Sequence, residues 1–307
     1  MTTRARTIFL GSGGFAVPVL EALSSHPTVE LISVVTAPTR PGSRGRPTDP
    51  PVAEWAATHG VPMLRPPRLR DPEAVASIAA LEPDLLVLAD YGQIVPQAVL
   101  NLPRHGALNL HPSLLPRHRG ASPIPAAILA GDEETGVALM LMDAGLDSGP
   151  LIAQARRRLA GSETTPDLEA DLAQIAASLL TDTLDAFLGG IAWPTPQDES
   201  AATFTRPLRR SDGRLDPSKS AAELERQVRA YQPWPGTFFE TTDGRVIVWT
   251  ARVIGGSAAL GTIVDGPAIA TSDGILEFVE VQPAGGRRMS GSDLLRGRPG
   301  LVGSSVA

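Results

Sequence analysis

A glycine-rich turn between an apolar strand and an amphipathic helix constrains the fold of this chain more than any other feature of its sequence. Residues 7–10 are typical of a buried strand, and Gly11-Ser-Gly-Gly14 is typical of a tight turn. Residues 15–25 then predict a helix with apolar side chains at 16, 19, 20 and 23, and a second strand follows at 31–36. This order opens a β-α-β unit, in which a helix connects two parallel strands of one sheet.

The alternation of strands and helices continues to about residue 190. Further strands are predicted at 85–89, 107–110, 137–142 and 151–154, and helices near 50–59, 71–81, 122–130 and 166–187. We therefore expect an α/β domain over residues 1–190, with a doubly wound, mostly parallel, Rossmann-like sheet.

The pattern changes after a proline-containing segment. Ala192-Trp-Pro-Thr-Pro-Gln197 predicts a linker over residues 191–202. Beyond it, short strands punctuated by glycine are predicted at 236–240, 245–250, 261–264 and 275–281, with one helix at 221–230. This pattern predicts that residues 203–307 form a small β-barrel domain, similar to an OB-fold.

Composition excludes several classes of protein. The 307 residues include no cysteine, which rules out disulfides, thiolate catalysis and cysteine-ligated metals. The longest apolar runs fall far short of the roughly 20 residues that a membrane span needs. Arg4 and Arg6 lead directly into a strand rather than into the apolar core of a signal peptide. We therefore expect a cytoplasmic protein without a membrane segment.

Charge is unevenly placed along the chain, although the net value is only −6. Residues 40–70 hold six arginines and two acids, and residues 204–230 hold seven bases and four acids. Between these segments, residues 71–200 hold six arginines and eighteen acids. The two basic segments could bind a polyanion, but solvated arginine loops explain the same pattern equally well.

The glycine turn also fits the template of a dinucleotide-binding loop. That template requires an acidic residue at the end of the second strand, where this chain has Val35-Thr36 followed by Ala-Pro. The better interpretation is a turn that lets the helix pack closely on the strand.

The densest polar motif is Asn109-Leu-His-Pro-Ser-Leu-Leu-Pro116, directly after an apolar strand. Because side chains two apart on a strand face the same way, Asn109 and His111 are expected to point into one crevice at the sheet's edge. A histidine there can transfer protons near neutral pH, and an amide can donate to a polarised carbonyl oxygen.

A second motif, Met142-Asp-Ala-Gly-Leu-Asp-Ser-Gly-Pro150, holds two carboxylates in a glycine-rich turn. Asp147 could reach the crevice and favour the protonated form of His111. Alternatively, Asp143 and Asp147 could do no more than stabilise the turn. The sequence leaves these two interpretations open.

Taken together, these motifs resemble those of formyltransferases that use 10-formyltetrahydrofolate. Further segments are similar to those of members acting on methionyl-tRNA, and they extend over nearly the whole chain: Phe15-Ala-Val-Pro-Val-Leu-Glu-Ala-Leu23, Arg40-Pro-Gly-Ser-Arg-Gly-Arg46, Tyr91-Gly-Gln-Ile-Val-Pro96, Arg117-His-Arg-Gly-Ala-Ser-Pro-Ile124, Gly131-Asp-Glu-Glu-Thr-Gly136, Pro233-Trp-Pro235 and Val281-Gln-Pro-Ala-Gly285. The chain departs from the family pattern at Gly13-Gly14, Asp90, Pro207 and Pro217.

The resemblance implies transfer of a formyl group to the amino group of methionyl initiator tRNA, for translation initiation. It implies that the catalytic residues are Asn109, His111 and Asp147. It implies that folate is bound by residues in two segments: Ser113, Leu114, Leu115 and Pro116, and Tyr91, Gly92, Gln93 and Ile94. No metal is implied, and we expect a monomer.

For tRNA we predict contacts from Arg40, Arg44 and Arg46, in a loop that follows the second strand and opens on the same side of the sheet as the crevice. Other classes are less consistent with the sequence. Glycinamide ribonucleotide formyltransferases lack a second domain, and formyltransferases of amino-sugar nucleotides fit the arginine-rich loop less well. A folate- or RNA-binding module without catalysis would not need Asn109, His111 and Asp147 together.

Overall fold

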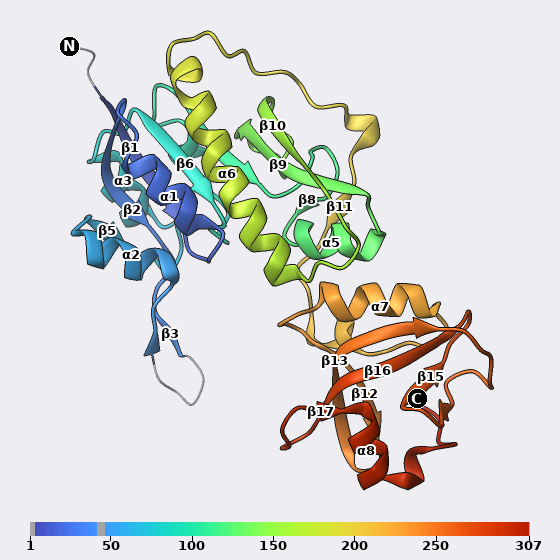
Figure 1. The fold of residues 1–307 in the computed structure, drawn as a ribbon. Coiled ribbons are helices and arrows are strands. Elements are labelled where there is room, and N and C mark those ends of the chain that lie inside the picture. Colours follow the sequence, from blue (N-terminus) through green and yellow to red (C-terminus); the bar gives the residue numbers. More distant parts are fainter. Residues whose placement is uncertain (1–3, 42–46, 307) are drawn as a thin grey trace. The chain divides into compact units, whose positions relative to one another are not determined.

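The computed structural model describes residues 4–41 and 47–306, which divide into two compact units (Figure 1). The first unit contains the described residues up to 123, with 134–158 and 169–205. The second contains 124–133, 159–168 and the described residues from 206 onward. Residues 191–202, which we predicted to be a linker, are thus part of the first unit.

A seven-stranded sheet organises the first unit. Its strands are β1 (Ala5–Gly11), β2 (Val29–Val35), β5 (Met63–Leu64), β6 (Leu85–Ala89), β7 (Ala107–His111), β9 (Glu134–Leu141) and β10 (Leu151–Arg158). The order is β10-β9-β7-β6-β1-β2-β5. The five strands from β7 to β5 are parallel, whereas β9 and β10 are antiparallel to their neighbours. The prediction of a mostly parallel α/β sheet is confirmed.

Helices connect these strands: α1 (Ala16–Ser24), α2 (Pro51–His59), α3 (Pro72–Ala79), α4 (Gln97–Leu100), α5 (Pro123–Ala130) and α6 (Thr165–Leu188). All of them except α4, which was not predicted, follow the predicted helices closely, because the apolar side chains recur at helical spacing. Four short strands make small pairs outside the main sheet: β3 (Arg40–Pro41) with β4 (Pro47–Thr48), and β8 (Arg119–Gly120) with β11 (Phe204–Thr205).

Side-chain alternation along β1 places apolar residues on both faces of the sheet. Ile8 and Leu10 belong to one core cluster with Ile78 of α3 and Val99 of α4. A Cβ on Gly11 would lie 2.5 Å from the Phe9 ring and 2.9 Å from the Cβ of Ala16. The glycine therefore allows α1 to start close against the strand, as the preferred interpretation of the turn required.

The second unit is built on an antiparallel sheet with the order β12-β13-β16-β15-β14, to which β17 adds beside β16. Its strands are β12 (Thr237–Thr241), β13 (Gly244–Ile254), β14 (Ile263–Val264), β15 (Ala268–Ala270), β16 (Ile275–Pro283) and β17 (Met289–Ser290). The helices of this region are α7 (Ala221–Ala230) and α8 (Gly291–Gly297).

The core of this second sheet lies between its strands and α7. Leu224 and Val228 of α7 share a cluster with Phe239 and Phe278, whose rings stack at 5.0 Å. α7 begins with a capping box, in which Ser220 and Glu223 satisfy each other's backbone N–H groups. A separate β domain after the α/β domain is thus confirmed. In residues 4–41 and 47–306, no helix combines the length and apolar composition that crossing a bilayer would require.

Candidate active site

The site is built around β7. β6 beside it and β1 beyond β6 run parallel to it, so the turns after these strands lie at the same edge of the sheet as the end of β7. Asn109 is half-buried and His111 is buried, and strand alternation directs both side chains to one side of the sheet.

The two nitrogens of His111 have different partners. Nε2 lies 3.0 Å from the carbonyl oxygen of His118. Because a carbonyl can only accept, Nε2 carries the hydrogen of this bond. Nδ1 lies 3.7 Å from Oδ2 of Asp147, a separation too long for a direct hydrogen bond. Nδ1 is therefore the ring nitrogen that faces the Asp147 carboxylate.

Asp147 is held on the loop between β9 and β10. Its Oδ2 accepts a 2.7 Å hydrogen bond from the N–H of Gly120. Its backbone has φ of 50°, in the left-handed region that aspartate and asparagine tolerate better than most residues. Only 15% of the Asp147 side chain is exposed, so the carboxylate lies in a partly dehydrated position beside His111.

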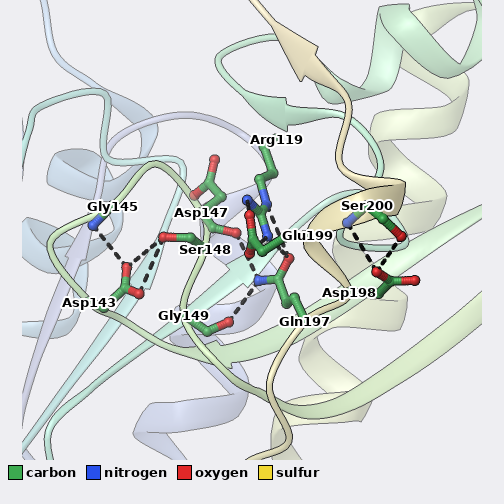
Figure 2. Close-up of polar contacts among 10 residues, drawn as sticks. All are labelled: Arg119, Asp143, Gly145, Asp147, Ser148, Gly149, Gln197, Asp198, Glu199 and Ser200. Carbon is green, nitrogen blue, oxygen red and sulfur yellow. Dashed lines mark hydrogen bonds and ion pairs between the residues drawn. The ribbon is translucent and has the colours of Figure 1, made fainter.

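The first carboxylate of the motif, Asp143, has a different role. Oδ1 of Asp143 accepts hydrogen bonds from Gly145 N–H and Ser148 Oγ, both at 2.9 Å. Figure 2 shows Asp143 turned toward these residues within its own loop. Asp143 thus stabilises the turn, whereas Asp147 faces His111.

The predicted folate segment that follows His111 forms a tight turn. Ser113 is fully buried and donates its hydroxyl to the carbonyl of Arg117 at 2.7 Å. Leu115 is buried with Ala138 and Met140, while its carbonyl accepts from Nε2 of Gln154 at 2.8 Å. Leu114 and Pro116 remain half-buried, so theirs are the side chains of this segment with surface to offer a ligand.

The other predicted folate segment is the loop after β6. Tyr91 is buried in the core, and burial raises the pKa of its phenol to about 12. Gln93 binds a neighbouring loop of the same domain, because its Oε1 accepts a hydrogen bond from Leu69 N–H at 2.9 Å. Gly92 has φ of 75° and no atom near a would-be Cβ, and Ile94 is 90% exposed. Gly92 and Ile94 therefore present the free surface of this loop.

Asp90, for which the sequence predicted no role in the site, joins two loops at the sheet's edge. Its carboxylate accepts from Gly13 N–H, and a Cβ on Gly13 would lie 1.8 Å from Oδ2 of Asp90. Desolvation and then repulsion from Glu169 raise the pKa of Asp90 to about 6, although the residue as a whole is exposed. The departures from the family pattern at positions 13 and 90 are thus one steric unit.

The residues after α6 also reach the site, which the prediction of a linker did not foresee. Gln197 is buried and donates from Nε2 to the carbonyls of Asp147 at 2.8 Å and Gly149 at 2.7 Å. Its Oε1 accepts from Arg119, whose guanidinium also binds Glu199 (Figure 2). No local sequence signal marks this contact, because Gln197 and Asp147 are 50 residues apart.

Of the three arginines predicted to bind tRNA, only Arg40 lies within the described residues. The backbone of Arg40 pairs with Thr48 where β3 meets β4. Arg44 and Arg46 lie outside the described residues. Next to this strand pair, the carboxylate of Asp49 accepts hydrogen bonds from Arg65 at 2.8 Å and from the hydroxyl of Thr39.

Comparison with known families identifies both parts of the chain. Residues 5–184 match the family described as formyl transferase. Residues 207–299 match the family described as formyl transferase, C-terminal domain.

Two similar relatives cover almost the whole chain. The methionyl-tRNA formyltransferase of Roseiflexus sp. strain RS-1 is 46% identical over 95% of this chain and 92% of its own length. That of Myxococcus xanthus is 42% identical over 98% of each chain.

Solved structures share the fold at low identity. An N-formyltransferase from Helicobacter canadensis, solved with folinic acid and dTDP-3-aminofucose, has a TM-score of 0.67 and 16% identity, and covers 89% of this chain and 98% of that one. HypX from Aquifex aeolicus, solved with tetrahydrofolic acid, has a TM-score of 0.62 and 17% identity over 95% of this chain. This chain spans about half the length of HypX, 47%.

The raised pKa of Asp90 predicts how stability depends on pH. The folded chain holds this proton more tightly than the unfolded chain, so stability is highest below the ordinary carboxyl pKa and falls as the pH rises through about 6. Asp90→Asn keeps an acceptor for Gly13 N–H and removes the charge. Its melting temperature should gain on wild type at about pH 8 by more than at about pH 5. Equal differences at both pH values, as expected for the exposed control Asp265→Asn, would contradict this assignment.

Proposed function

The chain belongs to the formyl transferase family, and on this premise we propose that it transfers the formyl group of 10-formyltetrahydrofolate to the α-amino group of methionyl initiator tRNA. The product is formylmethionyl-tRNA for translation initiation. The observation that carries this proposal is 46% identity, over 95% of the chain, to a relative named methionyl-tRNA formyltransferase. The geometry of His111 and Asp147 supports it.

The residues at the sheet's edge are compatible with a folate donor. Ile94 is 90% exposed, so a ring of the folate donor could pack against its apolar side chain. Gly92 leaves the backbone of the same loop open to close approach. We propose that these groups, with Leu114 and Pro116, contact the donor, while Ser113, Leu115, Tyr91 and Gln93 support the two segments from below. The donor supplies the N-formyl group whose carbon the methionyl amine attacks.

We propose that Asn109 and His111 stabilise negative charge at the formyl oxygen. A neutral amine is already a nucleophile, so no side chain has to be activated for attack. Attack places negative charge on the oxygen, to which the Asn109 amide and protonated Nδ1 of His111 would donate. One such donor lowers the barrier by roughly 3–4 kcal/mol. Because Nε2 is engaged with the His118 carbonyl, Nδ1 is the nitrogen that performs this role.

Asp147 completes the proposed mechanism. Its carboxylate faces Nδ1, which places a negative charge beside the nitrogen that would donate to the formyl oxygen. At 3.7 Å the two atoms share no direct hydrogen bond, so none has to be broken before Nδ1 binds a substrate group. Asp147 would then accept the proton of the attacking amine and pass it toward the leaving folate nitrogen.

For the tRNA, we propose that the second domain acts together with Arg40, Arg44 and Arg46, which are called the arginine arm below. We assign catalysis to residues 1–190 and tRNA binding to residues 203–307, joined by residues 191–202. Arg40, Arg44 and Arg46 would neutralise phosphates of the acceptor arm. One chain then carries both binding functions, so we expect it to act as a monomer, in the cytoplasm where initiation takes place.

A direct assay tests the reaction. Methionyl initiator tRNA and a labelled formyl donor are incubated with the chain, and formylmethionine is measured after hydrolysis of the ester. Formylation of glycinamide ribonucleotide or of an amino-sugar nucleotide in place of the tRNA would overturn the proposal. Binding of folate and tRNA without turnover would also contradict it.

His111→Ala and Asp147→Asn should each lower kcat at least ~100-fold, because both act on proton transfer and transition-state charge. The Kd for folate should stay within about threefold of wild type, since neither side chain contributes mainly to ground-state binding. Asparagine also tolerates the left-handed backbone at position 147. Single-turnover kinetics and folate titration measure both quantities, and near-normal turnover would exclude these residues from catalysis.

Asn109→Asp should lower kcat more than Asn109→Ala. The aspartate keeps the volume but places negative charge where negative charge must develop, whereas alanine only removes a donor. The two variants are compared at saturating substrates. If aspartate were the better tolerated of the two, Asn109 would not be a donor to the oxyanion.

Replacing Arg40, Arg44 and Arg46 together with alanine should raise the KM for methionyl-tRNA and flatten the dependence of tRNA affinity on salt. Folate binding should not change. The matched control replaces Arg104, Arg156 and Arg157, which pair with acidic residues of the first unit, and changes the net charge equally. Parallel salt slopes for wild type and the arm variant would refute the role of the arm.

A further inference from the structure

We propose that Gln197 is a positioning residue for Asp147 and fixes the loop that carries this carboxylate beside His111. This inference rests on the proposed function and adds to it a residue from the segment between the two family matches. The segment concerned, residues 195–205, is called the strap below.

The strap is anchored at both ends within the first unit. At one end, Thr195 and Leu151 exchange backbone hydrogen bonds of 2.8 Å in each direction, at the start of β10. At the other end, β11 pairs with β8, and Thr203 O accepts from Arg119 N–H at 2.9 Å. The residues in between are therefore held over a short span, and Gln197 is presented to the loop 143–149 from a fixed backbone.

The orientation of the Gln197 amide follows from its partners. Arg119 donates to Oε1 from Nε at 3.1 Å and from Nη2 at 2.8 Å. A guanidinium can only donate, so the amide oxygen has to face it, and the amide nitrogen then faces the loop. Arg119 is itself only 2% exposed and is held by Glu199 at 2.7 Å. The amide group thus has one orientation available.

Both donors of that amide are used on the loop. Nε2 binds the carbonyls of Asp147 and Gly149, at 2.8 and 2.7 Å, which flank Ser148 on either side. The bond to Gly149 is buried and the bond to Asp147 is partly buried, so losing them would leave two carbonyls of the loop without these partners in a position with little access to water. Figure 2 shows Gln197 between Arg119 on one side and the loop residues on the other.

The strap also fixes the group that binds the Asp147 carboxylate. The N–H of Gly120 donates to Oδ2 at 2.7 Å, and Gly120 lies in β8, paired with Thr205 of the strap. A Cβ on Gly120 would lie 2.3 Å from the Thr205 carbonyl oxygen. Backbone and side chain of Asp147 are thus both held by the strap or by its direct neighbour.

Two variants separate the donors of Gln197 from its acceptor. Gln197→Ala removes both, whereas Gln197→Glu keeps the acceptor for Arg119 but turns a carboxylate toward two carbonyls. Each should lower kcat at least ~10-fold, since a displacement near 1 Å costs that much or more in a positioned site. The KM values for folate and tRNA should stay within about threefold. The control for turnover is Gln97→Ala, which removes a first-unit glutamine that donates to the side chain of Asn101.

A double-mutant cycle tests whether Gln197 acts through Asp147. In an Asp147→Asn background, Gln197→Ala should lower kcat by less than about twofold, because the group that it positions has already been disabled. A loss of equal size in both backgrounds, or an unchanged kcat in the single variant, would overturn the proposal. A general effect on folding would act in both backgrounds and is thereby distinguished.

Hydrogen exchange gives a readout that does not depend on catalysis. Gln197→Ala should speed amide exchange in residues 143–149 and at Gly120. The matched control for exchange is Gln232→Ala, which removes a glutamine that donates to two carbonyls of the second unit and should leave these amides unchanged. Unchanged exchange in Gln197→Ala overturns the positioning role even if activity falls. If wild type does not formylate methionyl-tRNA, the proposed function fails, and exchange alone decides whether Gln197 holds the loop.

Discussion

The site depends on the approach of the Asp147 carboxylate to Nδ1 of His111, at 3.7 Å. The sheet by itself does not bring these groups together. β9 runs antiparallel to β7, and Leu141 near its end pairs with Leu108, at the opposite end of β7 from His111. The loop that follows must therefore turn back to reach the histidine, and it needs contacts from outside to stay there.

Those contacts require a backbone that few side chains would permit. Asp147 has φ of 50°, and a Cβ on Gly149 would lie 1.8 Å from the Leu141 carbonyl oxygen. Asp143 accepts from Gly145 and Ser148, which closes the first half of the same loop. The glycines and the first carboxylate of the motif thus shape the loop, and the second carboxylate remains available to face His111.

Much of this arrangement could be predicted from local patterns. Apolar periodicity located β6 at residues 85–89 and α6 to within a residue at each end, and alternation placed Asn109 and His111 on one side of β7. Short elements such as β15 and α8 gave no such signal. The sequence did not distinguish Asp143 from Asp147. Asp143 is bonded within its own turn and Asp147 to Gly120, 27 residues away, but an aspartate in a glycine-rich turn has the same sequence pattern in both cases.

The strap shows most clearly what local reasoning cannot reach. Pro194 and Pro196 favour a linker. The first family match ends before this segment, at residue 184, and the second begins after it, at residue 207. Yet Gln197 bonds to Asp147 and Arg119 across 50 and 78 residues. The segment that joins the two domains in sequence therefore also holds a candidate catalytic loop in place. A change in its length would therefore act on Asp147 as well as on the spacing of the domains.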